Sequence, residues 1–154
     1  MKKLNQLLAD ITAIKVVGNA EVEITSVTND SREAKPGALF IAVKGVAVDA
    51  HKFIPQVVAA GAAAVVCEDL PENLNDTVTY IQVADSTIAL AHLASAWYDH
   101  PSTKLRLEGV TGTNGKTTTA TLLYELTQSL GHKAGLLSTV KNMVDRTEYP
   151  AKQT

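Results

Sequence analysis

Cysteine is nearly absent from this sequence of 154 residues. Cys67 is the only one, so an internal disulfide and a zinc cluster are both excluded, and its apolar surroundings indicate a buried strand residue. No apolar run is long enough to span a membrane, and Asp10 and Lys15 interrupt the stretch that a signal peptide would need. We therefore expect a cytoplasmic protein with no membrane partner.

An excess of either charge is also missing. Lys and Arg number 14 and Asp and Glu number 16, which gives a net charge of −2 with the two signs well mixed. Such a balance gives no support for a surface that binds nucleic acid or acidic lipid. A hydrophobic content of 45% lets the chain bury an ordinary core, and we find no internal repeat or low-complexity segment.

Strand and helix patterns alternate along the first hundred residues and predict an α/β fold. Apolar spacing predicts strands over residues 22–28, 38–44, 62–67 and 78–83, and helices over 4–11, 53–60 and from Asp85 onward. The last of these helices is expected to be capped by Asp85-Ser86 and to bury Leu90, Leu93, Ala94, Trp97 and Tyr98. His100-Pro101-Ser102 breaks the pattern. We place a domain boundary there, with a small α/β domain over 1–101 and a second domain beginning at 102.

The stretch 105–119, L-R-L-E-G-V-T-G-T-N-G-K-T-T-T, predicts a phosphate-binding loop between a strand (105–110) and a helix (116–130). The first amides of a helix have no partner within it and attract anions, and glycines let the backbone approach phosphate oxygens. Lys116 would reach the β- and γ-phosphates of ATP, and the Thr117 hydroxyl would bind Mg²⁺. The general pattern G-x-x-x-x-G-K-[ST] requires glycine where this chain has Val110, so the loop is a variant.

The second domain has few predicted elements. After the helix, with Leu122, Leu123, Leu126 and Leu130 on one face, the pattern predicts only one more strand, over 134–139. A doubly wound sheet needs several more strands to cover both of its faces. We therefore expect the chain to be the N-terminal part of a longer protein, containing only the start of a P-loop ATPase domain.

Four motifs in order resemble the Mur ligase family, the ATP-dependent enzymes that build the peptide stem of bacterial peptidoglycan. They are T-N-D-S-R at 28–32, P-G-A-L-F-I-A-V-K-G at 36–45, H-P-S at 100–102 and G-V-T-G-T-N-G-K-T-T-T at 109–119. The resemblance implies a UDP-binding first domain and a central ATPase domain. It also implies amide-bond formation through an acyl phosphate, and it is strongest to the ligases that add the third stem residue, diaminopimelate or lysine.

The resemblance assigns site residues position by position. ATP would be bound by Gly112, Thr113, Asn114, Gly115, Lys116, Thr117 and Thr118, with Lys116 as the catalytic residue and Thr117 as the Mg²⁺ ligand. The UDP-N-acetylmuramoyl-L-alanyl-D-glutamate substrate would be contacted by Asn29, Ser31, Val46, Ala47, Val48, Gln153 and Thr154. The family further implies small-molecule partners only and a monomer. We expect the chain alone to bind ATP weakly and to be inactive.

Other interpretations stay open from the residues alone. The 29–32 segment has the composition of a plain turn, and Asp49 with His51 is typical of a structural pair. Alternative functions are a sister ligase that adds D-alanyl-D-alanine, a cyanophycin synthetase, a generic P-loop ATPase or switch, and a module that only binds UDP-sugars. Folylpolyglutamate synthase is disfavoured, because it lacks a UDP-binding first domain of this kind.

Overall fold

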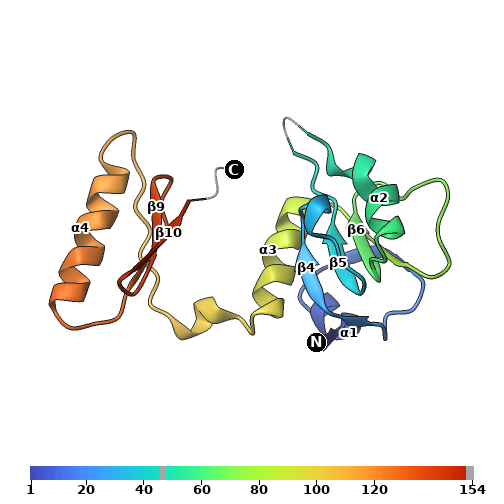
Figure 1. Cartoon of the computed structure of the whole chain (residues 1–154), viewed down its shortest axis with the longest axis horizontal. Coiled ribbons are helices and arrows are strands. Elements are labelled where there is room, and N and C mark those ends of the chain that lie inside the picture. The colour runs from blue at the N-terminus through green and yellow to red at the C-terminus, as the bar shows by residue number, and fades with distance from the viewer. Residues whose placement is uncertain (46–47, 152–154) are drawn as a thin grey trace. The chain divides into compact units, whose positions relative to one another are not determined.

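The computed structural model describes residues 1–45 and 48–151 and divides the chain into two compact units (Figure 1). We call Met1–Leu105 unit 1 and Arg106–Thr154 unit 2. Within the described residues, no helix combines the length and apolarity needed to cross a membrane. The boundary expected at residues 101/102 falls in the short 3-10 helix η3 (Pro101–Lys104), and the functional division of the chain at that point stays a prediction.

Unit 1 is built on a five-stranded sheet. Its order in the described residues is β2 (Ala13–Val17), β7 (Thr79–Val83), β6 (Ala64–Cys67), β5 (Ala38–Ile41) and β4 (Ser26–Thr28). The last four strands run parallel to one another, and β2 pairs antiparallel with β7. Parallel strands need crossover connections, which place helices on the faces of the sheet.

Helices cover both faces of the sheet, as Figure 1 shows. Alternate residues of β5 point to opposite sides: Leu39 and Ile41 join a core with α1 (Leu4–Leu8) and α3 (Ser86–Trp97), and Phe40 joins a core with α2 (Ile54–Ala59). All four residues of β5 and of β6 are fully buried. This double burial explains why these strands read as continuous apolar runs in the sequence.

Cys67 lies in the core against α2, as the sequence indicated. Its side chain is fully buried, and burial raises the pKa of the thiol to about 11. Because the thiolate is the reactive form of cysteine, this thiol is chemically inert at neutral pH.

Two details of unit 1 differ from expectation. The predicted strand over 22–28 is split into β3 (Glu23–Ile24), which pairs with β1 (Lys2–Lys3), and β4. The edge strand β2 was missed, because its outward residues include apolar Ile14 and Val16, which are 64% and 41% exposed. Half-buried strands are recognised by alternating apolar and polar residues, and apolar residues on the exposed face of β2 remove that alternation.

A side chain caps the start of α3, and backbone hydrogen bonds close its end. The Asp85 carboxylate accepts hydrogen bonds from the amides of Thr87 and Ile88 at 2.8 and 2.9 Å, so the predicted cap is confirmed. At the other end Trp97 is partly buried, but Tyr98 is 69% exposed, so the prediction that Tyr98 packs in the core is wrong. The helix has already ended at Tyr98, and Asp99 takes a left-handed conformation with φ 59°.

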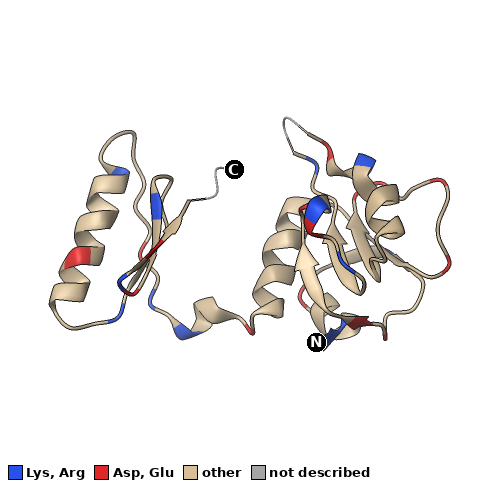
Figure 2. Cartoon of the chain, viewed as in Figure 1, with Lys and Arg blue, Asp and Glu red and all other residues tan. Residues whose placement is uncertain are grey.

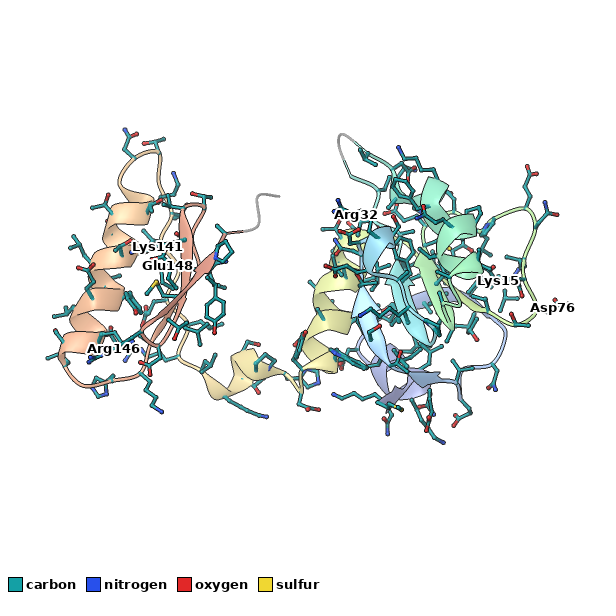
Figure 3. The ribbon with its side chains drawn as sticks, viewed as in Figure 1. Lys15, Arg32, Asp76, Lys141, Arg146 and Glu148 are labelled. Atoms are coloured by element: carbon teal, nitrogen blue, oxygen red, sulfur yellow. The ribbon has the colours of Figure 1, made fainter. Side chains whose placement is uncertain are left out.

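Unit 2 contains one helix and a small antiparallel sheet in its described residues. They are α4 (Lys116–Ser129), β8 (Gly135–Leu136), β9 (Lys141–Val144) and β10 (Thr147–Pro150). Figure 3 shows Lys141 on β9 and Glu148 on β10. Asp145, with φ 52°, turns the β9–β10 hairpin, and its carboxylate and carbonyl accept hydrogen bonds from Gln128 and Tyr124 of α4. The predicted helix is confirmed, whereas the strand expected over 134–139 shortens to two residues.

The strand predicted over 105–110 is wrong for this structure. The segment is irregular, and Leu105 and Leu107 are 63% and 69% exposed. A strand exists only where a neighbour supplies the ladder of hydrogen bonds, and no described strand pairs with this segment. For the same reason the leucines of α4 are uncovered: Leu122, Leu123, Leu126 and Leu130 are 60%, 45%, 55% and 67% exposed.

Removal of the α3 cap is expected to destabilise unit 1. Asp85→Ala leaves two helix amides without their acceptor and should lower the free energy of unfolding by about 1 kcal/mol in urea denaturation. Asp85→Asn keeps an oxygen acceptor at the same place and should stay close to the parent. An equal loss of unfolding free energy in both variants would show that Asp85 stabilises the helix through its charge rather than through its capping hydrogen bonds.

Candidate functional site

The loops that follow the parallel strands all lie at one edge of the unit 1 sheet. β4, β5, β6 and β7 run in the same direction, so their carboxyl ends meet at the same edge (Figure 1). The residues that follow these ends are Asn29 and Ser31 after β4, Lys44 and Gly45 after β5, Glu68 after β6, and Asp85 and Ser86 after β7. In open α/β sheets, ligands bind in the crevice outside the carboxyl ends of the strands.

The segment after β4 is held in a tight turn. Asp30 precedes the 3-10 helix η1 (Ser31–Glu33), and its carboxylate accepts from the Arg32 amide at 3.0 Å and pairs with the Arg32 guanidinium at 2.6 Å. That pairing raises the pKa of Arg32. Ser31 begins η1 and is half-buried, while Asn29 is exposed. A concavity of about 370 Å³ adjoins the turn, but its lining includes Arg32 (Figure 3) rather than Asn29 or Ser31.

The loop after β5 is folded back on itself. The amide of Gly45 donates to the carbonyls of Val43 and Val48, both at 3.1 Å, and Lys44 forms an isolated antiparallel bridge with Asp49. A Cβ at Gly45 would lie 2.8 Å from the Val48 carbonyl oxygen, so the close approach requires glycine. Val48 is 49% exposed. Four other predicted substrate residues, Val46, Ala47, Gln153 and Thr154, lie outside the described residues.

Glu68 joins the ends of β5, β6 and β7. Its carboxylate oxygen Oε1 accepts from the amide and the hydroxyl of Ser86 at 2.9 and 2.7 Å, and these bonds lower the pKa of Glu68. The same Ser86 hydroxyl accepts from the Lys44 amide at 3.1 Å. Ser86 is completely buried, so its hydroxyl depends on these partners.

His51 belongs to the 3-10 helix η2 (Ala50–Phe53) and links the loop to β6 from the other side. Its Nε2 accepts from the amide of Glu68 at 2.9 Å, so the ring proton lies on Nδ1 and is donated to the Asp49 carboxylate at 2.6 Å. The amide and ring of His51 lower the pKa of Asp49. The Asp49–His51 pair is thus part of the loop's scaffold, in agreement with the structural interpretation.

Charges at this edge are paired rather than gathered in one sign. Lys44 lies 3.4 Å from the Asp69 carboxylate, and Arg32 pairs with Asp30. Figure 2 shows Lys and Arg positions interspersed with Asp and Glu positions on unit 1. Exposed pairs of this kind are worth at most about 1 kcal/mol each, so a charged ligand can displace them at little cost.

The predicted phosphate loop in unit 2 precedes a helix start without a side-chain cap in the described residues. Gly112 and Gly115 have φ of 143° and 75°, and Gly115 precedes α4, which has no side-chain cap among the described residues. The first amides of α4 therefore stay free for an anion. The Lys116 Nζ bends back to the carbonyls of Gly112 and Thr113, at 2.5 and 3.2 Å.

The predicted ATP-binding residues lie together on this loop and the first turn of α4. Thr113, Asn114 and Thr118 are exposed, and Thr117 is half-buried. Among the described residues, no three His, Cys, Asp or Glu side chains gather in a way that could hold a metal ion. For the Mg²⁺ ligand predicted at Thr117, the remaining ligands would be phosphate oxygens and water, as is usual for this ion.

Comparison with known families covers most of the chain. A model described as "Mur ligase family, catalytic domain" matches residues 23–98, and one described as "Mur ligase middle domain" matches residues 110–154. The chain therefore belongs to the Mur ligase family, which confirms the predicted resemblance.

Two curated relatives within the family are both 2,6-diaminopimelate ligases. The UDP-N-acetylmuramoyl-L-alanyl-D-glutamate–2,6-diaminopimelate ligase of Bacteroides fragilis is 49% identical over 99% of this chain, and that of Cytophaga hutchinsonii is 50% identical over 99%. The chain spans only 31% and 32% of the lengths of these two relatives.

Solved structures confirm the α/β fold class. MurF from Acinetobacter baumannii aligns with a TM-score of 0.63 and 29% identity, over 83% of this chain and 28% of its own. MurF ligase from Thermotoga maritima, solved in complex with ADP, aligns with a TM-score of 0.52 and 32% identity, over 70% and 24%. A 2,6-diaminopimelate ligase structure, at 21% identity and a TM-score of 0.67, adds support for the fold alone.

Sequence reasoning missed Glu68 and Ser86, whose hydrogen bonds connect the strand ends at this edge. Their signal is positional: Glu68 directly follows a buried strand, and Ser86 follows the next strand by three residues. Polar residues just past the carboxyl ends of parallel strands are candidates for the site edge. That signal becomes usable only once the strands are known to be parallel neighbours.

The lowered pKa of Glu68 predicts an acid-sensitive edge. Because the folded-state pKa lies below the ordinary 4.5, the stabilisation is complete above pH 4.5 and is lost as pH falls through the folded value. Glu68→Gln should therefore lower stability at pH 7 and make its decline between about pH 5 and pH 3 shallower. Urea denaturation across that range measures this.

The matched control is Glu72→Gln, which removes the same charge from an exposed position in the loop between β6 and β7. The control should keep the acid decline of the parent. An unchanged acid decline in Glu68→Gln would mean that the bonds to Ser86 do not depend on ionisation.

Proposed function

We propose that the chain is the N-terminal part of an ATP-dependent ligase that adds diaminopimelate to UDP-N-acetylmuramoyl-L-alanyl-D-glutamate. The observation that carries the proposal is the presence, in one chain, of a parallel-sheet edge carrying Asn29, Ser31 and Val48 and of an uncapped helix preceded by Gly112 and Gly115. The names of the relatives that are 46–50% identical support this substrate. The MurF structures, at 29–32% identity, are more distant in sequence.

Unit 1 is proposed to bind the UDP part of the substrate. Ser31 at the start of η1 and the described loop residues Gly45 and Val48 follow neighbouring strands, so they share the edge at which ligands of such sheets bind. Backbone amides and a hydroxyl suit a uridine base and a diphosphate. Val46, Ala47, Gln153 and Thr154 are proposed contacts on the strength of the family resemblance.

Unit 2 is proposed to bind the ATP phosphates. The free amides at the start of α4 and the Lys116 ammonium would hold the β- and γ-phosphates, and Thr117 would help to hold Mg²⁺. Mg²⁺ supplies charge neutralisation on the phosphoryl group as it is transferred. The ADP in the Thermotoga maritima MurF structure supports nucleotide binding in a protein of this family.

The proposed reaction has two steps. The γ-phosphoryl group passes to the substrate carboxylate, giving an acyl phosphate and ADP, and the amine of diaminopimelate then attacks the acyl carbon and releases phosphate. Lys116 would stabilise the charge that develops on the transferred group, which makes it the catalytic residue of this chain. We further propose that the protein works in the cytoplasm as a monomer, with only small molecules as substrates.

UDP binding tests the role of unit 1. UDP and UDP-N-acetylmuramoyl-L-alanyl-D-glutamate should each raise the melting temperature of the chain, because a ligand that binds only the folded state stabilises it. Ser31→Ala should remove most of this shift while leaving the unliganded melting temperature within about 2 °C. UDP-glucose serves as a comparison ligand. A chain that melts unchanged with every UDP compound would rule out the proposal.

ATP binding tests unit 2 separately. For the 154-residue chain we expect a smaller thermal shift with ATP·Mg than with UDP compounds, because the leucine face of α4 is uncovered and the loop is poorly supported. Lys116→Ala should abolish even this shift. We also expect no amide-bond formation by the chain alone. A strong shift with ATP·Mg and none with UDP would instead favour a generic P-loop ATPase.

A further inference from the structure

Both ends of the loop after β5 are tied to one residue, Glu68. At the start of the loop, the Lys44 amide donates to the Ser86 hydroxyl, which donates to the Glu68 carboxylate. At the end of the loop, the Glu68 amide donates to His51 Nε2, and the His51 ring donates to Asp49. Glu68 thus holds one end through its side chain and the other through its backbone.

The hydrogen bonds of this network indicate the protonation states of Glu68 and His51. Glu68 accepts two hydrogen bonds on one oxygen, as a carboxylate does, and His51 accepts on Nε2, as only the neutral ring can. The network spans 42 residues of sequence between Lys44 and Ser86 and 17 between His51 and Glu68. Bonds over such separations fix the loop relative to the sheet rather than only within itself.

We propose that Glu68, Ser86 and His51 are positioning residues that hold Gly45 and Val48 in the arrangement that receives the UDP part of the substrate. The inference rests on the proposed function of unit 1. The contacts of these side chains are polar: Glu68 accepts from Ser86, and His51 accepts from the Glu68 amide and donates to Asp49. Their hydrogen bonds converge instead on the loop that carries the proposed substrate contact Val48.

Two substitutions at His51 separate the halves of its role. His51→Asn keeps a donor near Asp49 but is too short to reach the Glu68 amide, and His51→Gln extends an acceptor toward that amide. Ser86→Ala removes the two hydrogen bonds that hold the start of the loop, and His51→Asn removes the bond to the Glu68 amide at its end. Each single variant should weaken UDP binding by about tenfold. His51→Gln should stay within about threefold of the parent.

Thr79→Val is the matched control. Thr79 and Ser86 are the two buried polar residues found in the described part of the chain, and Thr79 begins β7 at the opposite edge of the sheet, donating to the Asn19 carbonyl at 2.8 Å. Its substitution removes one buried side-chain hydrogen bond, whereas Ser86→Ala removes two, and it leaves the loop untouched. It should lower the melting temperature and leave the UDP affinity of the chain unchanged.

Calorimetric titration with UDP and amide hydrogen exchange decide the outcome for the 154-residue chain. Weaker UDP binding in Ser86→Ala and His51→Asn, with faster exchange of the Lys44 and Glu68 amides and an unaffected Thr79→Val, supports the positioning role. Parent-like UDP affinity in both variants overturns it and leaves the proposed function standing. If the unsubstituted chain does not bind UDP, the proposed function fails and the positioning role fails with it.

The double variant Ser86→Ala/His51→Asn tests whether the two ends of the loop are coupled, which a general loss of stability would not show. If one released end already frees the loop, the second substitution should cost much less UDP affinity than it does alone, because coupled residues are not additive. Fully additive losses would mean that the two ends act independently, which contradicts a shared anchor at Glu68.

Discussion

The constraint on which unit 1 depends is that a parallel sheet must be buried on both faces. Leu39 and Phe40 are neighbours in sequence, yet they belong to two different cores. Helices can cover both faces only through crossover connections, and such connections place the carboxyl ends of the four parallel strands at one edge. The convergence of Ser31, Gly45 and Glu68 is therefore a by-product of hydrophobic burial, available for chemistry without further cost.

The fold of unit 1 was largely predictable because its strongest signals are local. The apolar runs of β5, β6 and β7 and the Asp85 cap depend on a few consecutive residues, and each was confirmed. The edge strand β2 escaped because its exposed face carries Ile14 and Val16. The opposite error occurred at 105–110, where a strand was predicted and none is found. Its alternating pattern is typical of a strand, but no described strand pairs with it.

The parts of the candidate site that are made of consecutive residues could be predicted from the sequence, and the parts that meet only in the fold could not. The phosphate loop is a single run of residues whose spacing carries its chemistry, so Gly112 to Thr118 could be proposed from the sequence. The Glu68–Ser86–His51 network could not, because its members meet only after the three strands β5, β6 and β7 are placed side by side. Sequence reasoning correctly favoured a structural role for Asp49 and His51, but it did not indicate that the pair connects the loop after β5 to Glu68.

The burial of Cys67 has a practical consequence for spectroscopy. A completely buried thiol with a pKa of about 11 is almost entirely protonated at neutral pH and out of reach of maleimides. A cysteine introduced at an exposed position would therefore be the one that reacts, without any need to mutate the native residue. One introduced cysteine in each unit would thus carry a pair of fluorophores or spin labels while Cys67 stays unlabelled, and such a pair makes the distance between the two units measurable.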